Sequence, residues 1–161
     1  MSNYTAIREW ADEKTADKTR IIVGLGTCGI AAGGNKILEA VEKTLANNDD
    51  IKAEVVSVGC IGICYKEPLL DIEIPGQPRL SYGSVTAKDT REIIQNIFLD
   101  SKYEHKKTLA TINDEAFAEI PSWKEIPFFA PQERRVLRNC GFIDPEKIED
   151  YIANDGYLGL D

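Results

Sequence analysis

The sequence predicts an α/β fold in which a mixed β-sheet is covered by helices, followed by a C-terminal extension. Two patterns predict this fold. A strand, a glycine-rich loop, a helix and a second strand follow one another over residues 20–58, and a β-hairpin followed by a helix occupies residues 69–99. A strand–helix–strand unit with a right-handed crossover has parallel strands, whereas the strands of a hairpin are antiparallel. The element order is therefore βαβ followed by ββα.

The first half of the chain begins with a short amphipathic helix over residues 3–15, which is expected to pack on the unit that follows it. The β-branched run Ile21-Ile22-Val23 predicts the first strand, and a loop over residues 24–29 follows it. Residues 35–46 carry apolar side chains at helical spacing and predict a helix. Residues 53–58 form a second β-branched run and predict the second strand.

The second half of the sheet is predicted by a strand over residues 69–74, a turn at Pro75-Gly-Gln-Pro78 and a return strand over residues 79–82. Thr86 is a suitable N-cap for a helix that runs to about Leu99. The Glu67-Pro68 pair stands directly before the third strand, where we expect a cis peptide bond. This order of elements predicts thioredoxin-like topology.

Beyond Asp100 neither the helical nor the strand period is sustained, so an extended connector is expected until a short strand or turn over residues 134–140. Asp144-Pro145-Glu146 predicts the start of a helix that ends near Asn154, with Gly156 as its left-handed C-terminal residue. The chain thus divides into an N-terminal helix (1–19), a thioredoxin-like domain (20–102) and a connector with a short helix (103–161).

Composition limits the possible functions. The 161 residues carry 19 basic and 27 acidic side chains, and the resulting net charge of −8 disfavours binding to nucleic acid or to an anionic membrane. No apolar segment is long enough for a membrane span or a leader peptide, so a cytoplasmic protein without membrane insertion is expected. In that compartment four cysteines are better explained as ligands or reactive thiols than as disulfides.

Three cysteines lie on glycine-rich loops that directly follow predicted strands. Cys28 follows the first strand, and Cys60-Ile-Gly-Ile-Cys64 follows the second. Because the carboxyl ends of parallel neighbours meet at one edge of a sheet, the three thiols are expected to lie close together. Thiolates are soft ligands that suit an iron–sulfur cluster, and the glycines let backbone N–H groups approach the sulfurs. The pattern therefore predicts a metal-bound redox site.

At these residues the chain resembles the thioredoxin-like [2Fe-2S] ferredoxins, in the version found at the N-terminus of the NADH- and flavin-binding subunit of bifurcating hydrogenases and complex-I-like NADH dehydrogenases. The matching motifs are Gly-Thr-Cys28-Gly-Ile-Ala-Ala-Gly, Gly59-Cys60-Ile-Gly-Ile-Cys64 with Glu67-Pro68, Pro75-Gly-Gln-Pro, Val136-Leu-Arg-Asn-Cys140-Gly and residues 148–157. The last two look like the stretch that leads into the family's flavin domain. Together the motifs cover nearly the whole chain.

The resemblance implies a [2Fe-2S] cluster held by Cys28, Cys60 and Cys64. It also implies an electron-transfer domain or small subunit of an NAD(P)H-linked oxidoreductase complex, which is not catalytic alone and has flavin/NADH-binding and iron–sulfur subunits as partners. The family's flavin domain would begin after Asp161, so no flavin site is expected here.

One ligand of the family is missing. The family has a further cysteine five residues before the position of Cys28, and this chain has Val23 there. The fourth ligand is left open: the hydroxyl of Thr27 or Ser57, a residue from a partner, or an exogenous thiol. The alternative is a docking module that keeps the fold without a cluster.

Three other functions fit single motifs. Gly24-Leu-Gly-Thr-Cys-Gly29 matches a dinucleotide-binding fingerprint, but no acidic residue ends the second strand. A thiol-redox enzyme is disfavoured because three residues separate Cys60 from Cys64 where the thioredoxin motif has two. Zinc binding would need the only histidine, His105, which we expect to be solvated in a charged connector. Cys140 is expected to be structural.

Overall fold

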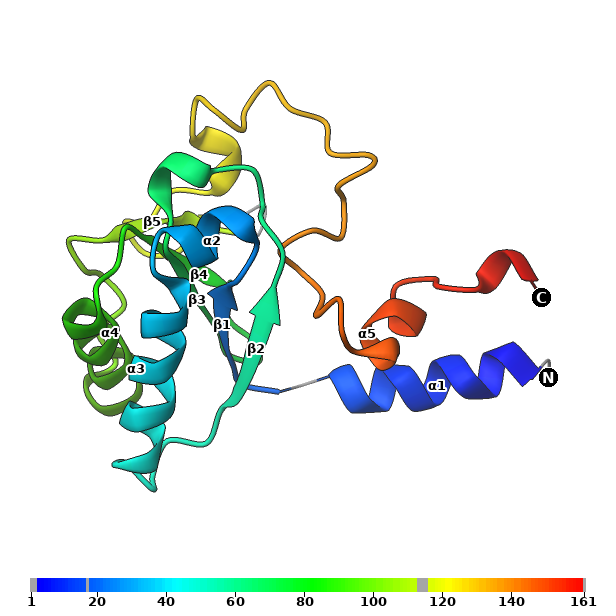
Figure 1. The fold of residues 1–161 in the computed structure, drawn as a ribbon, viewed down its shortest axis with the longest axis horizontal. Helices are drawn as coiled ribbons and strands as arrows, with labels where there is room; N and C mark the ends of the chain where they lie inside the picture. Colours follow the sequence, from blue (N-terminus) through cyan, green and yellow to red (C-terminus); the bar gives the residue numbers. More distant parts are fainter. Residues whose placement is uncertain (1–2, 17, 113–115, 161) are drawn as a thin grey trace.

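A computed structural model of the chain describes residues 3–16, 18–112 and 116–160. Its centre is a five-stranded sheet with the order β2-β1-β3-β4-β5 (Figure 1). The strands are β1 (Arg20–Gly24), β2 (Glu54–Val58), β3 (Leu69–Glu73), β4 (Leu80–Gly83) and β5 (Thr108–Thr111). The first two strands are parallel, and the remaining neighbours pair antiparallel. The expected mixed sheet with βαβ-ββα order is confirmed.

The predicted hairpin and the predicted cis peptide bond are also confirmed. β3 and β4 pair antiparallel with Leu70 opposite Tyr82, and the Glu67-Pro68 bond is cis. The fifth strand was not predicted. It pairs with β4, so the sheet extends beyond residue 102, and the expectation of an extended connector is wrong for this stretch.

Helices α3 (Gly34–Ala46) and α4 (Ala87–Asp100) lie side by side over one face of the sheet (Figure 1). Alternate residues of β1 point to this face, and they join the apolar stripes of both helices in the main core. The fully or almost fully buried members include Ile21, Val23, Val41, Leu70 and Ile94. This packing fixes the strand ends that carry the cysteine loops.

The loop after β1 departs from the prediction because part of it is helical. A short helix, α2 (Thr27–Ala31), begins inside the expected loop and carries Cys28. The chain turns tightly here: a β-carbon at Gly29 would lie 2.2 Å from the carbonyl oxygen of Gly24, so no larger residue fits. The close glycine spacing is therefore explained by this turn.

The opposite face of the sheet carries a buried ion pair. The side chains of Asp71 on β3 and Arg79 before β4 are each 5% exposed, and Arg79 Nε donates to Asp71 Oδ2 at 3.0 Å. Arg79 Nη2 also donates to the carbonyl oxygen of Gly141 at 2.6 Å. One arginine thus joins the sheet to the C-terminal part of the chain, 62 residues away in sequence.

The two ends of the chain pack on each other beside the sheet. Helix α1 (Asn3–Thr15) lies against α5 (Ile148–Ala153), and the Tyr4 hydroxyl donates to the Gly156 carbonyl at 3.0 Å (Figure 1). The N-terminal helix was predicted, but its partner is α5 and not the unit that follows it in sequence. None of the helices among the described residues is long and apolar enough to cross a membrane.

Two details of the C-terminal helix are corrected. The helix starts at Ile148 and not at Asp144, because Asp144 Oδ1 accepts the Glu146 N–H at 3.0 Å and closes a separate turn. The left-handed residues after the helix are Asp155 and Tyr157, and Gly156 between them has no positive φ. Residues 136–140 form a turn, which confirms the short strand or turn expected there.

The start of α4 makes a testable pH-dependent contribution to stability. Thr86 caps the helix as predicted, and its hydroxyl and backbone N–H both donate to Asp89 Oδ2. Burial raises the pKa of Asp89, but these hydrogen bonds and the Lys106 ammonium outweigh it and lower the pKa to about 2. Because the pKa of Asp89 is lower in the folded state than in the unfolded state, where it is about 3.9, the ionised carboxylate stabilises the fold at pH values above about 3.9. This contribution is lost as the pH falls towards 2.

Asp89→Asn should therefore lower the free energy of unfolding by about 1 kcal/mol at pH 7. The difference in this free energy between the variant and the native chain should shrink as the pH falls from 5 to 3. Urea unfolding across this range measures it. Asp100→Asn, at the exposed end of the same helix, serves as the control. A difference between Asp89→Asn and the native chain that stays constant with pH would contradict this account.

Candidate cluster site

The Cys60–Cys64 loop is anchored by its isoleucines. Ile61 and Ile63 are 7% and 2% exposed, and they pack with Leu69, Ile112 and Phe129 in a second hydrophobic cluster. The alternating residues Cys60, Gly62 and Cys64 remain partly or fully exposed. Gly62 has a φ of +98°, which bends the loop, and its N–H donates to Cys60 Sγ at 3.2 Å. The buried isoleucines therefore fix the loop, while the two thiols remain accessible.

Helix α2 brings Cys28 to the same place. A β-carbon at Gly26 would lie 3.0 Å from the Cys60 backbone nitrogen, so the two loops are in contact. Cys60 Sγ and Cys64 Sγ are 3.5 Å apart, and all four cysteines of the chain are free. Contact with the Cys64 thiol, together with its charge, raises the pKa of Cys28. The structure thus brings together the three cysteines that the sequence singled out.

The thiols hinder one another's ionisation. Burial raises the pKa of Cys60, the Gly62 N–H partly opposes this, and the neighbouring Cys64 raises it further. Thiolates this close repel one another, since like charges disfavour each other's ionisation. A bound metal cation would relieve this repulsion and make the charged, ligating form of each thiol favourable.

The spacing of the sulfurs fits ligands of a cluster better than ligands of one ion. Two thiolates on one tetrahedral metal with bonds of about 2.3 Å lie about 3.8 Å apart, close to the 3.5 Å between Cys60 and Cys64. In the described part of the chain, however, the three cysteines do not form a group whose ligand atoms all lie within 4.8 Å of one another. Sulfurs separated in this way suit a cluster that contains more than one iron atom. The residues present therefore fit three of its four protein ligands.

The position of the missing family ligand lies inside the core. Val23 is fully buried in β1, opposite Ser57 on β2 and Leu70 on β3. Its side chain packs in the main cluster under α3 and α4 and not in the loops. Thr27 is the exposed first residue of α2, and Ser57 is half-buried within β2. The strand itself thus offers no ligand at residue 23.

Sequence reasoning treated Glu67 only as part of a motif. Its side chain lies under the cysteine loops, because β-carbons at Gly24 and Gly29 would come within 3.1 Å and 3.3 Å of Glu67 Oε2. Oε2 accepts the Leu69 N–H at 2.9 Å, whereas the buried Oε1 has no hydrogen-bond partner. Burial raises the pKa of this carboxyl. Its position directly before Pro68 and the predicted third strand was the available signal.

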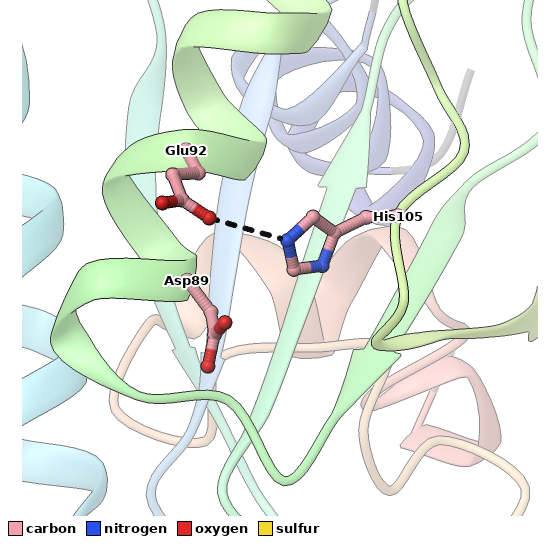
Figure 2. A group of neighbouring side chains, drawn as sticks. All are labelled: Asp89, Glu92 and His105. Carbon is pink, nitrogen blue, oxygen red and sulfur yellow. Dashed lines mark ion pairs between the residues drawn. The ribbon is translucent and has the colours of Figure 1, made fainter.

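The zinc alternative is not supported by the position of His105. Its side chain is 10% exposed, so the expectation of a solvated histidine is wrong. Figure 2 shows its partners: Nε2 lies 3.6 Å from Glu92 Oε2, and Asp89 lies beside them. His105 Nδ1 accepts the Lys107 N–H at 3.2 Å and Nε2 faces Glu92, so both ring nitrogens already have neighbours other than the cysteines. The Lys106 ammonium already lies 3.2 Å from Asp89 Oδ1.

The C-terminal part of the chain lies on the Cys60 loop. A β-carbon at Gly141 would come within 1.8 Å of Ile61 Cγ2, and Gly141 has a φ of +83°. Arg134 holds this segment, since its Nη2 donates to the carbonyl oxygens of Leu137 and Cys140 at 2.7 Å and 2.6 Å. Sequence analysis missed this contact because nothing local to residues 134–141 indicates which loop they cover.

Gly141→Ala should destabilise the fold by about 1–3 kcal/mol, because the added methyl group overpacks Ile61 and the backbone is left-handed. Gly76→Ala is the matched control, with a φ of +77° but open space around its β-carbon, and it should cost less. Urea unfolding of both variants measures the difference. Equal costs would show that Gly141 does not pack against Ile61.

Comparisons with known proteins agree with the fold and the motifs. No protein-family model matches the sequence. The chain is 37% identical over 89 residues to the NADP-reducing hydrogenase subunit HndB of Solidesulfovibrio fructosivorans, which covers 54% of this chain and 71% of HndB. It is also 69% identical over 29 residues to subunit HndC of the same hydrogenase, but this match spans 18% of the chain and only 6% of HndC.

Among solved structures, two of the thioredoxin-like [2Fe-2S] ferredoxin from Aquifex aeolicus are similar. They have TM-scores of 0.52 and 0.53 at 14% and 12% identity, and they cover 60% and 64% of this chain and 100% of each ferredoxin chain. At such low identity the likeness establishes the fold alone. With the HndB match, it leads to one conclusion: the chain belongs to the family of the hydrogenase subunit HndB and has the fold of the thioredoxin-like [2Fe-2S] ferredoxins.

Proposed function

We propose that this protein is an electron-transfer subunit of a hydrogenase-type complex and that Cys28, Cys60 and Cys64 hold a [2Fe-2S] cluster. The observation that carries the proposal is the convergence of these three thiols, from two loops, at one edge of the sheet. The relatives support a role in a hydrogenase-type complex, since HndB and HndC are subunits of an NADP-reducing hydrogenase. The bound group would supply one-electron redox chemistry.

The protein's own residues account for the other requirements of an electron carrier. Ile61 and Ile63 fix the loop, so the thiols change position little between redox states. The Gly62 N–H, which donates to Cys60 Sγ, stabilises negative charge on that sulfur. Cys28 and Cys64 are exposed, so a redox partner can approach the site closely. We place its partners among the flavin/NAD(P)H-binding and iron–sulfur subunits of the complex, in the cytoplasm.

A docking module without a cluster is the second candidate. The observation that favours it is Val23, which stands in the core where the family has a cysteine. A protein of this kind would keep the thioredoxin-like surface for its partner subunits and leave electron transfer to their clusters.

Protein-film voltammetry of the anaerobically reconstituted chain separates the two functions. An electron carrier gives a reversible one-electron wave, which is absent from a Cys60→Ala/Cys64→Ala double variant on the same electrode. A docking module gives no wave for either protein. It still binds the other subunits of its complex equally well with and without the two cysteines, as measured by co-purification of the assembled complex.

A further inference from the structure

The remaining cysteine of the chain lies at the edge of the candidate cluster site. Cys140 directly precedes Gly141, whose backbone is in contact with Ile61 and lies near the Gly59 carbonyl oxygen. Ile61 is the neighbour of Cys60 in sequence. The turn over residues 136–140 therefore ends beside the Cys60 loop, although Cys140 is 80 residues away from it.

Arg134 connects the two cysteines electrostatically. Its guanidinium group donates to the Cys140 carbonyl oxygen and lies over the rings of Trp123 and Phe142, at 5.6 Å and 5.5 Å from their centroids. Burial lowers the pKa of Arg134, and the charges of Cys140 and Cys60 both act to raise it. The guanidinium group therefore lies within electrostatic range of both sulfurs.

The same guanidinium group has a hydrogen-bond donor that is not used. Its Nη1 is buried and has no hydrogen-bond partner among the described residues. A buried, charged donor without a partner costs free energy, unless a negative group is present in the working protein. Thiolates at Cys60 and Cys140 would be negative groups of this kind.

The fourth ligands that the sequence left open within the chain suit an iron–sulfur cluster less well than a cysteine does. Val23 is inside the core, and the hydroxyl oxygens of Thr27 and Ser57 are harder ligands than the thiolates that iron–sulfur clusters use. Cys140 is free and half-buried, so it is available for ligation and is not a core-filling side chain. It stands apart from the other three sulfurs, but the turn that carries it is open to solvent, with Val136 95% and Leu137 54% exposed. Apart from the hydrogen bonds of Arg134 to the carbonyl oxygens of Leu137 and Cys140, the exposed side chains of this turn make few packed contacts that would oppose a shift.

We propose that Cys140 is the fourth protein ligand of the cluster, supplied by the C-terminal segment when the turn over residues 136–140 closes on the Cys60 loop, with Arg134 offsetting the added negative charge. This proposal rests on the proposed function, because it concerns the cluster that Cys28, Cys60 and Cys64 would hold. It replaces the purely structural role expected for Cys140 from the sequence.

The test compares variants after anaerobic reconstitution with iron and sulfide and desalting into buffer without added thiol. The iron content of Cys140→Ala should be at least about tenfold lower than that of the native chain. Even substitutions of residues that only support the direct ligands lower metal affinity tenfold or more. Cys140→Ser should keep some cluster, with its visible charge-transfer bands moved to shorter wavelength because oxygen replaces sulfur. Thr27→Val and Ser57→Ala are the controls, and both should match the native chain.

Circular dichroism and thermal unfolding of the apoproteins confirm that the variants are folded. Cys140→Ala with two irons per chain and an unchanged EPR spectrum would overturn the proposal while leaving the proposed function intact. Loss of iron from Thr27→Val or Ser57→Ala alone would assign the fourth ligand to that hydroxyl and also overturn it. If the native chain itself binds no iron, both the proposal and the proposed function fail.

Discussion

Replacing Cys64 by alanine should remove the iron from the reconstituted protein and leave its fold intact. Cys64 is the central sulfur of the three, because its Sγ is 3.5 Å from Cys60 Sγ and it also contacts the Cys28 thiol. Its loss leaves only Cys28 and Cys60 of the three candidate ligands. Iron and acid-labile sulfide should fall at least about tenfold from two of each per chain.

The apoprotein should be almost unaffected by this change. Cys64 is exposed, and surface substitutions usually alter the free energy of unfolding by less than about 0.5 kcal/mol. Tyr65→Ala provides the matched control, since Tyr65 is the next residue, is 62% exposed and carries no thiol. It should bind iron like the native chain. Full iron content in Cys64→Ala, or loss of iron in Tyr65→Ala, would show that ligation at this loop has been assigned wrongly.

Replacing Arg79 by methionine should lower the free energy of unfolding by about 3–5 kcal/mol. The substitution leaves the carboxylate of Asp71 without its cation in a position where it is 5% exposed and where its Oδ1 already has no hydrogen-bond partner. It also removes the hydrogen bond from Arg79 to the Gly141 carbonyl oxygen. Urea unfolding of the apoprotein measures the loss.

Two further measurements separate the effects of Arg79. The double variant Asp71→Leu/Arg79→Met should recover most of the lost stability, because replacing both members of a buried ion pair by apolar groups is often neutral. It should not restore the link to Gly141. Trypsin should therefore cleave after the exposed residues Arg135 and Arg138 faster in both variants than in the native chain. A single variant as stable as the native chain would exclude an important role for the ion pair.

The βαβ-ββα order could be predicted because each of its elements carries its own local signal. The β-branched run Ile21-Ile22-Val23, the helical spacing in residues 35–46 and the Thr86 cap all depend on neighbours in sequence. The meeting of Cys28 with Cys60 and Cys64 followed from one topological rule, that the carboxyl ends of parallel strands share an edge.

The missed features depend on contacts between distant residues. Strand β5 is a four-residue segment, Thr108–Thr111, that follows a charged stretch, and it is ordered by pairing with β4. The position of Cys140 beside the Cys60 loop depends on the packing of Gly141 on Ile61 and on the hydrogen bonds of Arg134. His105 was expected to be solvated because its connector is charged, but it folds back onto Glu92 of α4. Local composition carries no information on such contacts.

The most direct test of the cluster at Cys28, Cys60 and Cys64 is low-temperature EPR of the anaerobically reconstituted native chain, before and after reduction with dithionite. A [2Fe-2S] protein is silent when oxidised and, after reduction, gives the signal of one unpaired electron per two irons. We predict about one such spin per chain. No signal from a chain that binds no iron, with all four thiols open to alkylation, would contradict the account.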